Sequence, residues 1–205
     1  LSLNERCSKL NKLASELKNH LSPLAAIITE EMVNPITQAQ AEIQKSADLC
    51  TYYAKNSSSL LSFPEPEIQA SPLGIILGIM PWNFPVWQVI RFAIPTLAIG
   101  NATLIKHAPN MPQTAGYIQT LFHNANIHAY QNAFLSHNQI ETLIPDPRLA
   151  GISLTGSERT GRTIGTLAGK HLKNHHERLR HVAQRELPRP LGALCEARRG
   201  RVCHL

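Results

Sequence analysis

The sequence predicts an α/β fold in which a leading helical hairpin is followed by an open parallel β-sheet with helices on both faces. Apolar residues recur every three or four positions from Leu3, which indicates an amphipathic helix at the start. Between Ile75 and Lys173, short apolar runs alternate with helix-length segments, and this alternation is typical of a parallel sheet. With 205 residues, of which 43% are hydrophobic, the chain is long enough to bury a sizeable core.

The spacing of leucines and prolines sets the helices expected before the sheet. The first stripe consists of Leu3, Cys7, Leu10, Leu13, Leu17 and Leu21. Ser22 and Pro23 then fit an N-cap followed by proline at the first helical position, and Pro35 opens a long helix that reaches Ala54. Residues 57–71, with Phe-Pro-Glu-Pro in their middle, are expected to form a linker.

The rest of the chain divides into predicted strands and helices. Strands are expected at residues 75–80, 102–106, 133–136 and 151–155, and helices at residues 86–99, 112–125, 139–144 and 158–173. Gly74 and Gly78 are isolated strand glycines, which we expect to serve packing.

The chain changes in composition after Lys173. Residues 174–205 contain seven Arg but no Lys, Phe, Trp or Tyr, and they show no apolar period. We therefore expect N-terminal helices at 1–61, a linker at 62–72, a partial α/β domain at 73–173 and a disordered or non-native tail at 174–205. The alternative for the tail is a basic arm for nucleic acid or an acidic partner.

Charge and composition exclude several functions. The net charge of +6 arises largely in the tail, because residues 1–173 hold 13 Lys and Arg against 11 Asp and Glu, whereas residues 174–205 hold 7 against 3. We expect no nucleic-acid partner. The apolar stretches are shorter than the roughly 20 residues of a membrane helix, and no secretory signal is evident, so we expect no membrane partner and a cytoplasmic location. Four cysteines without paired or zinc-like spacing predict free thiols and no metal site.

Polar groups gather where three of the predicted strands end. The segments are Met80–Pro85, Lys106–Asn110 and Thr155–Ser157. Open α/β sheets bind ligands at the carboxyl ends of their strands, and these side chains suit a nucleotide. We therefore expect a dinucleotide-binding domain, although no G-x-G-x-x-G fingerprint is present.

These same segments carry a family resemblance. In order they are Pro81-Trp-Asn-Phe-Pro85, Gly100-Asn-Ala-Thr-Leu-Ile-Lys106 and Leu154-Thr-Gly-Ser157. Over residues 1–173 the chain resembles the aldehyde dehydrogenase superfamily. The sequences of its motifs are most similar to those of the bacterial succinate-semialdehyde dehydrogenase branch. The resemblance implies NAD or NADP as cofactor, a small aldehyde such as succinate semialdehyde as substrate and the carboxylic acid as product. It also implies a homo-oligomer, but the linker is short where the family has an oligomerisation strand, so this chain is not expected to assemble in that way.

The resemblance implies roles for the residues after the first strand. Asn83 would be catalytic, because its amide would help to hold the oxyanion; the alternative is an Asn that only stabilises the turn. Trp82 would contact the cofactor or simply pack in the core. Phe84 would form a wall of the substrate tunnel.

Cofactor contacts are implied at the other two strand ends. Lys106 would meet a ribose or phosphate, or would be a solvated strand end. Gly156 and Ser157 would hold the pyrophosphate at the start of a helix, where Ser157 can also act as an N-cap. Pro109 stands where many NAD-preferring members have a Glu that would repel a 2′-phosphate, so NADP is expected to be used as well as NAD.

Arg91 lies in the otherwise apolar run Val86–Ile99, where an unpaired guanidinium would be costly, so we expect it to be buried with an anion partner. The resemblance implies that this partner is the distal carboxylate of the substrate. The alternatives are an Arg that reaches the surface or that pairs with a structural carboxylate.

Two catalytic residues of the family have no match here. Where the family has a Glu-Leu-Gly-Gly motif with the general base, this chain has Asn174–Arg180, and Glu177 lacks the following Leu-Gly-Gly. Cys195 and Cys203 match no nucleophile motif. We therefore expect no turnover from this chain, and the alternative to an enzyme is a non-catalytic nucleotide-binding remnant or a broken-gene product.

Overall fold

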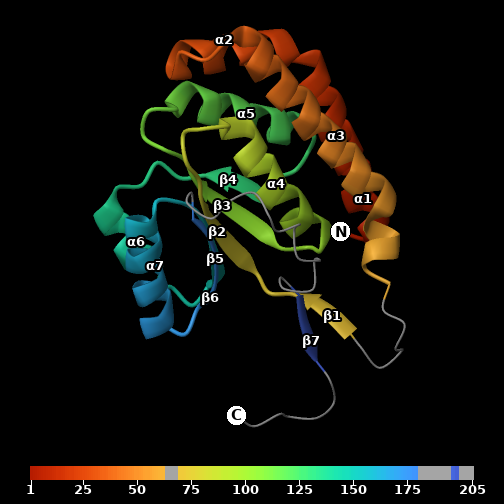
Figure 1. The fold of residues 1–205 in the computed structure, drawn as a ribbon. Helices are drawn as coiled ribbons and strands as arrows, with labels where there is room; N and C mark the ends of the chain where they lie inside the picture. The colour runs from red at the N-terminus through yellow and green to blue at the C-terminus, as the bar shows by residue number, and fades with distance from the viewer. Residues whose placement is uncertain (63–68, 180–194, 199–205) are drawn as a thin grey trace.

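The computed structural model describes residues 1–62, 69–179 and 195–198. Its elements are α1 (Leu3–Asn19), α2 (Leu21–Met32), α3 (Ile36–Leu60), β1 (Gln69–Pro72), β2 (Ile75–Ile79), α4 (Pro85–Ala98), β3 (Ala102–Lys106), α5 (Pro112–Asn124), β4 (Tyr130–Asn132), α6 (His137–Leu143), β5 (Leu149–Gly156), α7 (Glu158–Lys170), β6 (Asn174–Leu179) and β7 (Cys195–Arg198). The predicted α/β class is confirmed (Figure 1).

The central sheet of the described residues is parallel, with the strand order β4-β3-β2-β5-β6. The chain moves outward from β2 through β3 to β4 and then returns to the other side of β2 to form β5 and β6. The direction of winding therefore reverses between β2 and β5. In open α/β sheets, the crevice at such a reversal is where ligands bind.

The two faces of the sheet bury two separate apolar clusters. Because side chains alternate along a strand, Ile76 belongs to the cluster under α4 and α5, whereas Leu77 belongs to the cluster with Ile140 of α6 and Ile164 of α7. The N-terminal helices form an outer layer against α4 and α5 (Figure 1). Their leucine stripe points inward: Leu10, Leu13 and Leu17 are buried in the first cluster.

Three details of the predicted elements were wrong. Helix α2 begins at Leu21, with His20 as its N-cap, so Ser22 does not cap it; Pro23 is its third residue, where a missing N–H costs little. Helix α3 continues to Leu60, so the linker does not start at Ser57. The strand expected at 133–136 lies at Tyr130–Asn132, because the fully buried Tyr130 ring stacks on Phe122 with centroids 3.8 Å apart.

The boundary expected after Lys173 was also wrong, because Asn174–Leu179 form β6 and pair in parallel with β5. The sequence did not predict this strand because its residues are mostly polar and lack an apolar run. His175 and His176, for example, are exposed. The rest of the predicted tail lies outside the described residues except for β7, which pairs antiparallel with β1.

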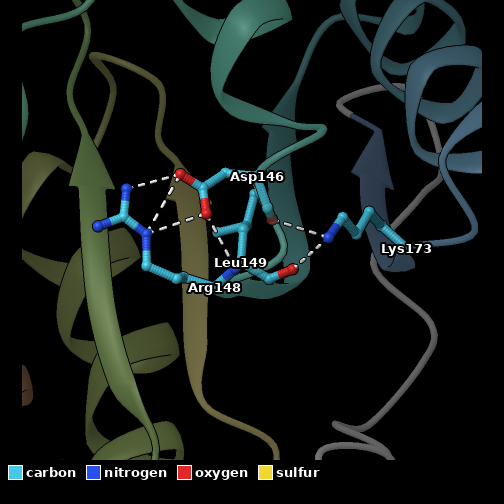
Figure 2. A network of polar contacts seen from close by, with 4 residues as sticks. All are labelled: Asp146, Arg148, Leu149 and Lys173. Carbon is cyan, nitrogen blue, oxygen red and sulfur yellow. Dashed lines mark hydrogen bonds and ion pairs between the residues drawn. The ribbon is translucent and has the colours of Figure 1, made fainter.

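Lys173 fastens the start of β6 to the loop before β5. Its ammonium donates hydrogen bonds to the carbonyl oxygens of Asp146, at 2.9 Å, and Leu149, at 2.8 Å (Figure 2). In the same loop, Arg148 Nη2 lies 2.7 Å from Asp146 Oδ2, and its hydrogen bonds lower the pKa of Asp146 to about 2. A single lysine therefore satisfies two carbonyls where β5 and β6 begin, at the end of the sheet opposite Lys106.

The two strand glycines serve different purposes. A Cβ at Gly78 would lie 2.7 Å from Phe92 Cε1 and 2.9 Å from Ile105 Cδ1, so the predicted packing role is confirmed there. At Gly74 the packing interpretation was wrong: a Cβ would meet Ala150 Cβ at an ordinary 3.6 Å, and the backbone instead needs glycine because its φ is +127°.

We predict that Gly78→Ala lowers the free energy of unfolding by about 1 to 3 kcal/mol, because the added methyl forces the α4 contact apart. Gly116→Ala is the matched control, since nothing lies within 4 Å of a Cβ there and the residue sits inside α5. It should leave stability unchanged or raise it by up to about 1 kcal/mol. Urea denaturation measures both, and equal effects would contradict the packing role of Gly78.

We predict that Lys173→Met destabilises the chain by about 1 to 3 kcal/mol, because two partly buried carbonyls lose a charged donor. Lys170→Met, at the exposed end of α7, is the control and should change stability by less than about 0.5 kcal/mol. Hydrogen exchange should also speed up in β6 of the Lys173 variant. Unchanged exchange there would show that the strand does not depend on this anchor.

Candidate functional site

The predicted site segments meet at one edge of the sheet. Ile79, the last residue of β2, aligns with Lys106 in β3 on one side and with Leu154 in β5 on the other. The turn after β2, the segment after Lys106 and the start of α7 are therefore neighbours at the carboxyl edge. This edge includes the winding reversal between β2 and β5, where a ligand is expected.

The turn that carries Asn83 is tight and strained. It starts with a hydrogen bond from the Met80 N–H to the Lys106 carbonyl at 2.9 Å, and Asn83 is half-buried within it. Phe84 ends the turn with φ 53° and ψ 59°, a left-handed conformation that costs a residue with a side chain roughly 1 to 2 kcal/mol. Strain of this kind is common where a backbone presents functional groups.

The aromatic residues beside Asn83 face outward. Trp82 is 46% exposed and Phe84 is 49% exposed, and such large apolar side chains are normally buried. The core-packing alternative for Trp82 was therefore wrong. Both rings are available at the surface of the site.

Helix α4 is capped by a residue that sequence reasoning missed. Phe84 provides no side-chain cap, and Glu42 of α3 takes its place: Glu42 Oε1 accepts hydrogen bonds from the N–H groups of Val86 and Trp87, each at 2.8 Å. Glu42 is 5% exposed, and burial raises its pKa to about 7 although both hydrogen bonds favour the charged form. The sequence signal that could have revealed this cap is the position of Glu42 on the same helix face as the apolar residues Ala39 and Ile43.

A cavity of about 640 Å³ opens between α3 and α4 beside this cap. It is lined by Gln38, Ala41, Glu42 and Lys45 from α3 and by Phe84, Trp87, Gln88 and Arg91 from the α4 side. Arg91 Nη2 donates to Gln88 Oε1 at 2.7 Å, and Arg91 is half-buried at the wall of the cavity. A concave site with aromatic walls and two cationic side chains suits a small anionic molecule.

Lys106 is 7% exposed at the end of β3, so the solvated strand-end alternative was wrong. Burial lowers its pKa, and among the described residues it forms no ion pair. The next residue, His107, is also buried and lies 3.2 Å from Asn132 Oδ1; burial lowers its pKa to about 4, which makes it neutral at pH 7. Pro109 follows in an exposed turn.

The predicted N-cap role of Ser157 is confirmed. Ser157 is the N-cap, and its Oγ accepts a hydrogen bond from the Thr160 N–H at 3.3 Å. The residue is exposed, and Gly156 before it ends β5. Helix N-termini with free N–H groups attract anions, so capping does not remove the suitability of this end for a phosphate.

The cysteines whose side chains are described lie away from these segments. Cys7 and Cys50 are free thiols on α1 and α3, and burial raises the pKa of Cys50. No group of three or more His, Cys, Asp or Glu in residues 1–62, 69–179 and 195–198 is placed to hold a metal ion. Among these residues, no helix combines the length and apolar character needed to cross a membrane.

A comparison of the chain with models of known protein families agrees with the motifs at the strand ends. The model of the aldehyde dehydrogenase family matches residues 1–179. The chain belongs to the aldehyde dehydrogenase family. The match includes β6, which extends the family region past Lys173 to Leu179.

Similar members of the family are named as succinate-semialdehyde dehydrogenases. The NADP(+) enzyme of Deinococcus radiodurans is 40% identical over 180 residues, which cover 83% of this chain and 38% of that protein. The NAD(P)+ enzyme of Escherichia coli is 40% identical over 184 residues, which cover 84% of this chain and 39% of that protein. The chain thus spans about two fifths of the length of these relatives.

A solved structure of the family shows the same fold. The crystal structure of succinic semialdehyde dehydrogenase from Streptococcus pyogenes, in complex with NADP+, superposes with a TM-score of 0.82 at 33% identity. The superposition covers 86% of this chain and 41% of that one.

The unusual pKa of Glu42 predicts a pH-dependent stability. An unfolded Glu ionises near its ordinary value of 4.5, whereas folded Glu42 keeps its proton until about pH 7, so its contribution is lost as the pH rises from 4.5 through 7. Glu42→Gln keeps an acceptor for Val86 and Trp87 but has no charge. Its stability relative to the original chain should therefore rise between pH 5 and pH 8, by on the order of 2 to 3 kcal/mol.

Glu42→Leu is the control, because it removes the acceptor and leaves two helix N–H groups unsatisfied. It should be destabilised at every pH, by about 1 to 3 kcal/mol. Thermal or urea unfolding across the pH range measures all three proteins. A constant difference between Glu42→Gln and the original chain would contradict the raised pKa.

Proposed function

We propose that this chain forms the cofactor-binding and substrate-orienting part of an NAD(P)-dependent aldehyde dehydrogenase that oxidises an aldehyde bearing a carboxylate, with succinate semialdehyde as the expected substrate. The observation that most directly supports this proposal is the cavity between α3 and α4. It is lined by both Phe84 and Arg91 and borders the turn with Asn83. The names of the similar enzymes from Deinococcus radiodurans and Escherichia coli support the substrate class.

The residues at the strand ends fit a dinucleotide. Lys106 is a buried cation without an ion pair among the described residues, which suits a ribose hydroxyl or a phosphate. Ser157 and the first N–H groups of α7 suit the pyrophosphate, and the exposed Trp82 offers a flat apolar surface. Pro109 places no carboxylate next to Lys106, which supports use of NADP as well as NAD.

Each of the other site residues has a distinct task in this proposal. The Asn83 amide donates a hydrogen bond to the aldehyde oxygen as negative charge develops on it. Arg91 holds the distal carboxylate, and a guanidinium suits this task because it can donate two parallel hydrogen bonds. Phe84 covers the reacting carbon and excludes water. The nicotinamide cofactor supplies a hydride acceptor when it is bound.

A non-catalytic nucleotide-binding chain is the second candidate. The observation in its favour is that the two cysteines whose side chains the structure describes lie on α1 and α3, and the buried Cys50 thiol is held protonated by its raised pKa. A protonated thiol is a poor nucleophile. Both candidates expect NADP+ binding, and turnover is expected from neither, since the family's general base and nucleophile have no match in this sequence. Saturable binding of succinate semialdehyde in the presence of NADP+ would support the enzyme part, and NADP+ binding without binding of the aldehyde would support the nucleotide-binding chain.

We predict that Arg91→Met weakens binding of succinate semialdehyde about ten- to a hundredfold, because a charge-assisted pair is worth roughly 1.5 to 3 kcal/mol. Binding of butanal, which has the same length but no carboxylate, should be unchanged. Titration calorimetry of the purified chain in the presence of NADP+ measures both. The exposed Arg148→Met is the control, and equal losses for the two aldehydes would assign Arg91 a purely structural role.

A further inference from the structure

The cavity between α3 and α4 contains a second cation, which faces Arg91 from the other helix. Lys45 lies three residues after Glu42, so both side chains occupy the same face of α3. The Lys45 ammonium lies 4.0 Å from the centre of the Trp87 ring. Such a cation–π contact places the charge at the α3 wall of the cavity.

Glu42 lines the same cavity as Lys45, but the two side chains form no ion pair. Among the described residues, Lys45 takes part in no ion pair. Glu42 is the acidic side chain that lines the cavity, but its Oε1 is engaged by two backbone N–H groups and the residue is almost fully buried. The cavity therefore presents positive charge from both helices, and an anion is the complementary ligand.

We propose that Lys45 is a specificity-determining residue, which binds the carboxylate of an aldehyde acid from the α3 wall while Arg91 binds it from the α4 wall. This inference rests on the proposed function and adds a second, independent contact to the same cavity. A carboxylate held from two helices is selected by both charge and position, and a neutral aldehyde gains nothing from either contact. Trp87 keeps the ammonium in place between binding events.

The test is a titration of the purified chain with succinate, with neutral succinamide as the uncharged comparison. We expect Lys45→Met to weaken succinate binding about tenfold, as for the loss of a partly exposed charge-assisted contact, and to leave succinamide binding unchanged. Lys45→Arg should bind succinate with an affinity within about threefold of the original chain, since it keeps the charge and the stacking on Trp87. Lys55→Met, on the exposed side of α3, is the matched control and should bind succinate normally.

Nuclear magnetic resonance gives a site-resolved readout, because the indole N–H of Trp87 should shift when succinate binds the original chain and not when it binds Lys45→Met. Unchanged succinate affinity in Lys45→Met, with a loss in Arg91→Met, would overturn the role of Lys45 and leave the proposed function standing. Unchanged affinity in both variants, or no saturable succinate binding by the original chain, would overturn both. A loss in Lys55→Met equal to that in Lys45→Met would reduce the effect to net charge and overturn the proposal.

Discussion

Two carboxylates from the N-terminal helices cap the two helices that cover one face of the sheet, and this interaction determines how the two layers fit together. Glu42 accepts from the N–H groups of Val86 and Trp87 at the start of α4. Glu31 does the same for α5: its two oxygens accept from the N–H groups of Gln113, at 2.7 Å, and Thr114, at 2.9 Å. Neither α4 nor α5 has a side-chain cap of its own.

The cap of α4 lies beside the candidate site. A carboxylate at a helix N-terminus is favourable, but the apolar contact that positions α3 also buries Glu42 and raises its pKa to about 7. The Glu42 hydrogen bonds hold the first turn of α4 directly after Phe84, whose left-handed backbone is strained. The cavity, the strained turn and the buried cap therefore lie next to one another at the start of α4.

Some elements and site residues were missed for reasons that lie in their three-dimensional neighbours. Strand β6 lies at the edge of the described sheet, and its consecutive residues Asn174, His175 and His176 are all exposed, so its sequence has no apolar run to mark it as a strand. Strand β4 has three residues, too short for a periodic signal, and it is positioned by the stacking of Tyr130 on Phe122. Lys45 was overlooked because it is an exposed lysine on a long helix, as most helix lysines are, and its position over Trp87 depends on how α3 crosses α4.

The sequence by itself determined the α/β class, most of the strand and helix order and the three strand-end segments with Asn83, Lys106 and Ser157, because these depend on local apolar periodicity and on short motifs. It could not determine the cap of α4 by Glu42, the exposure of Trp82 or the cavity shared by Phe84, Lys45 and Arg91. The cap joins Glu42 to Val86, 44 positions later, and only the packing of α3 against α4 brings the residues of the cap and of the cavity together. Burial and charge at such contacts depend on the neighbouring element, which no local pattern encodes.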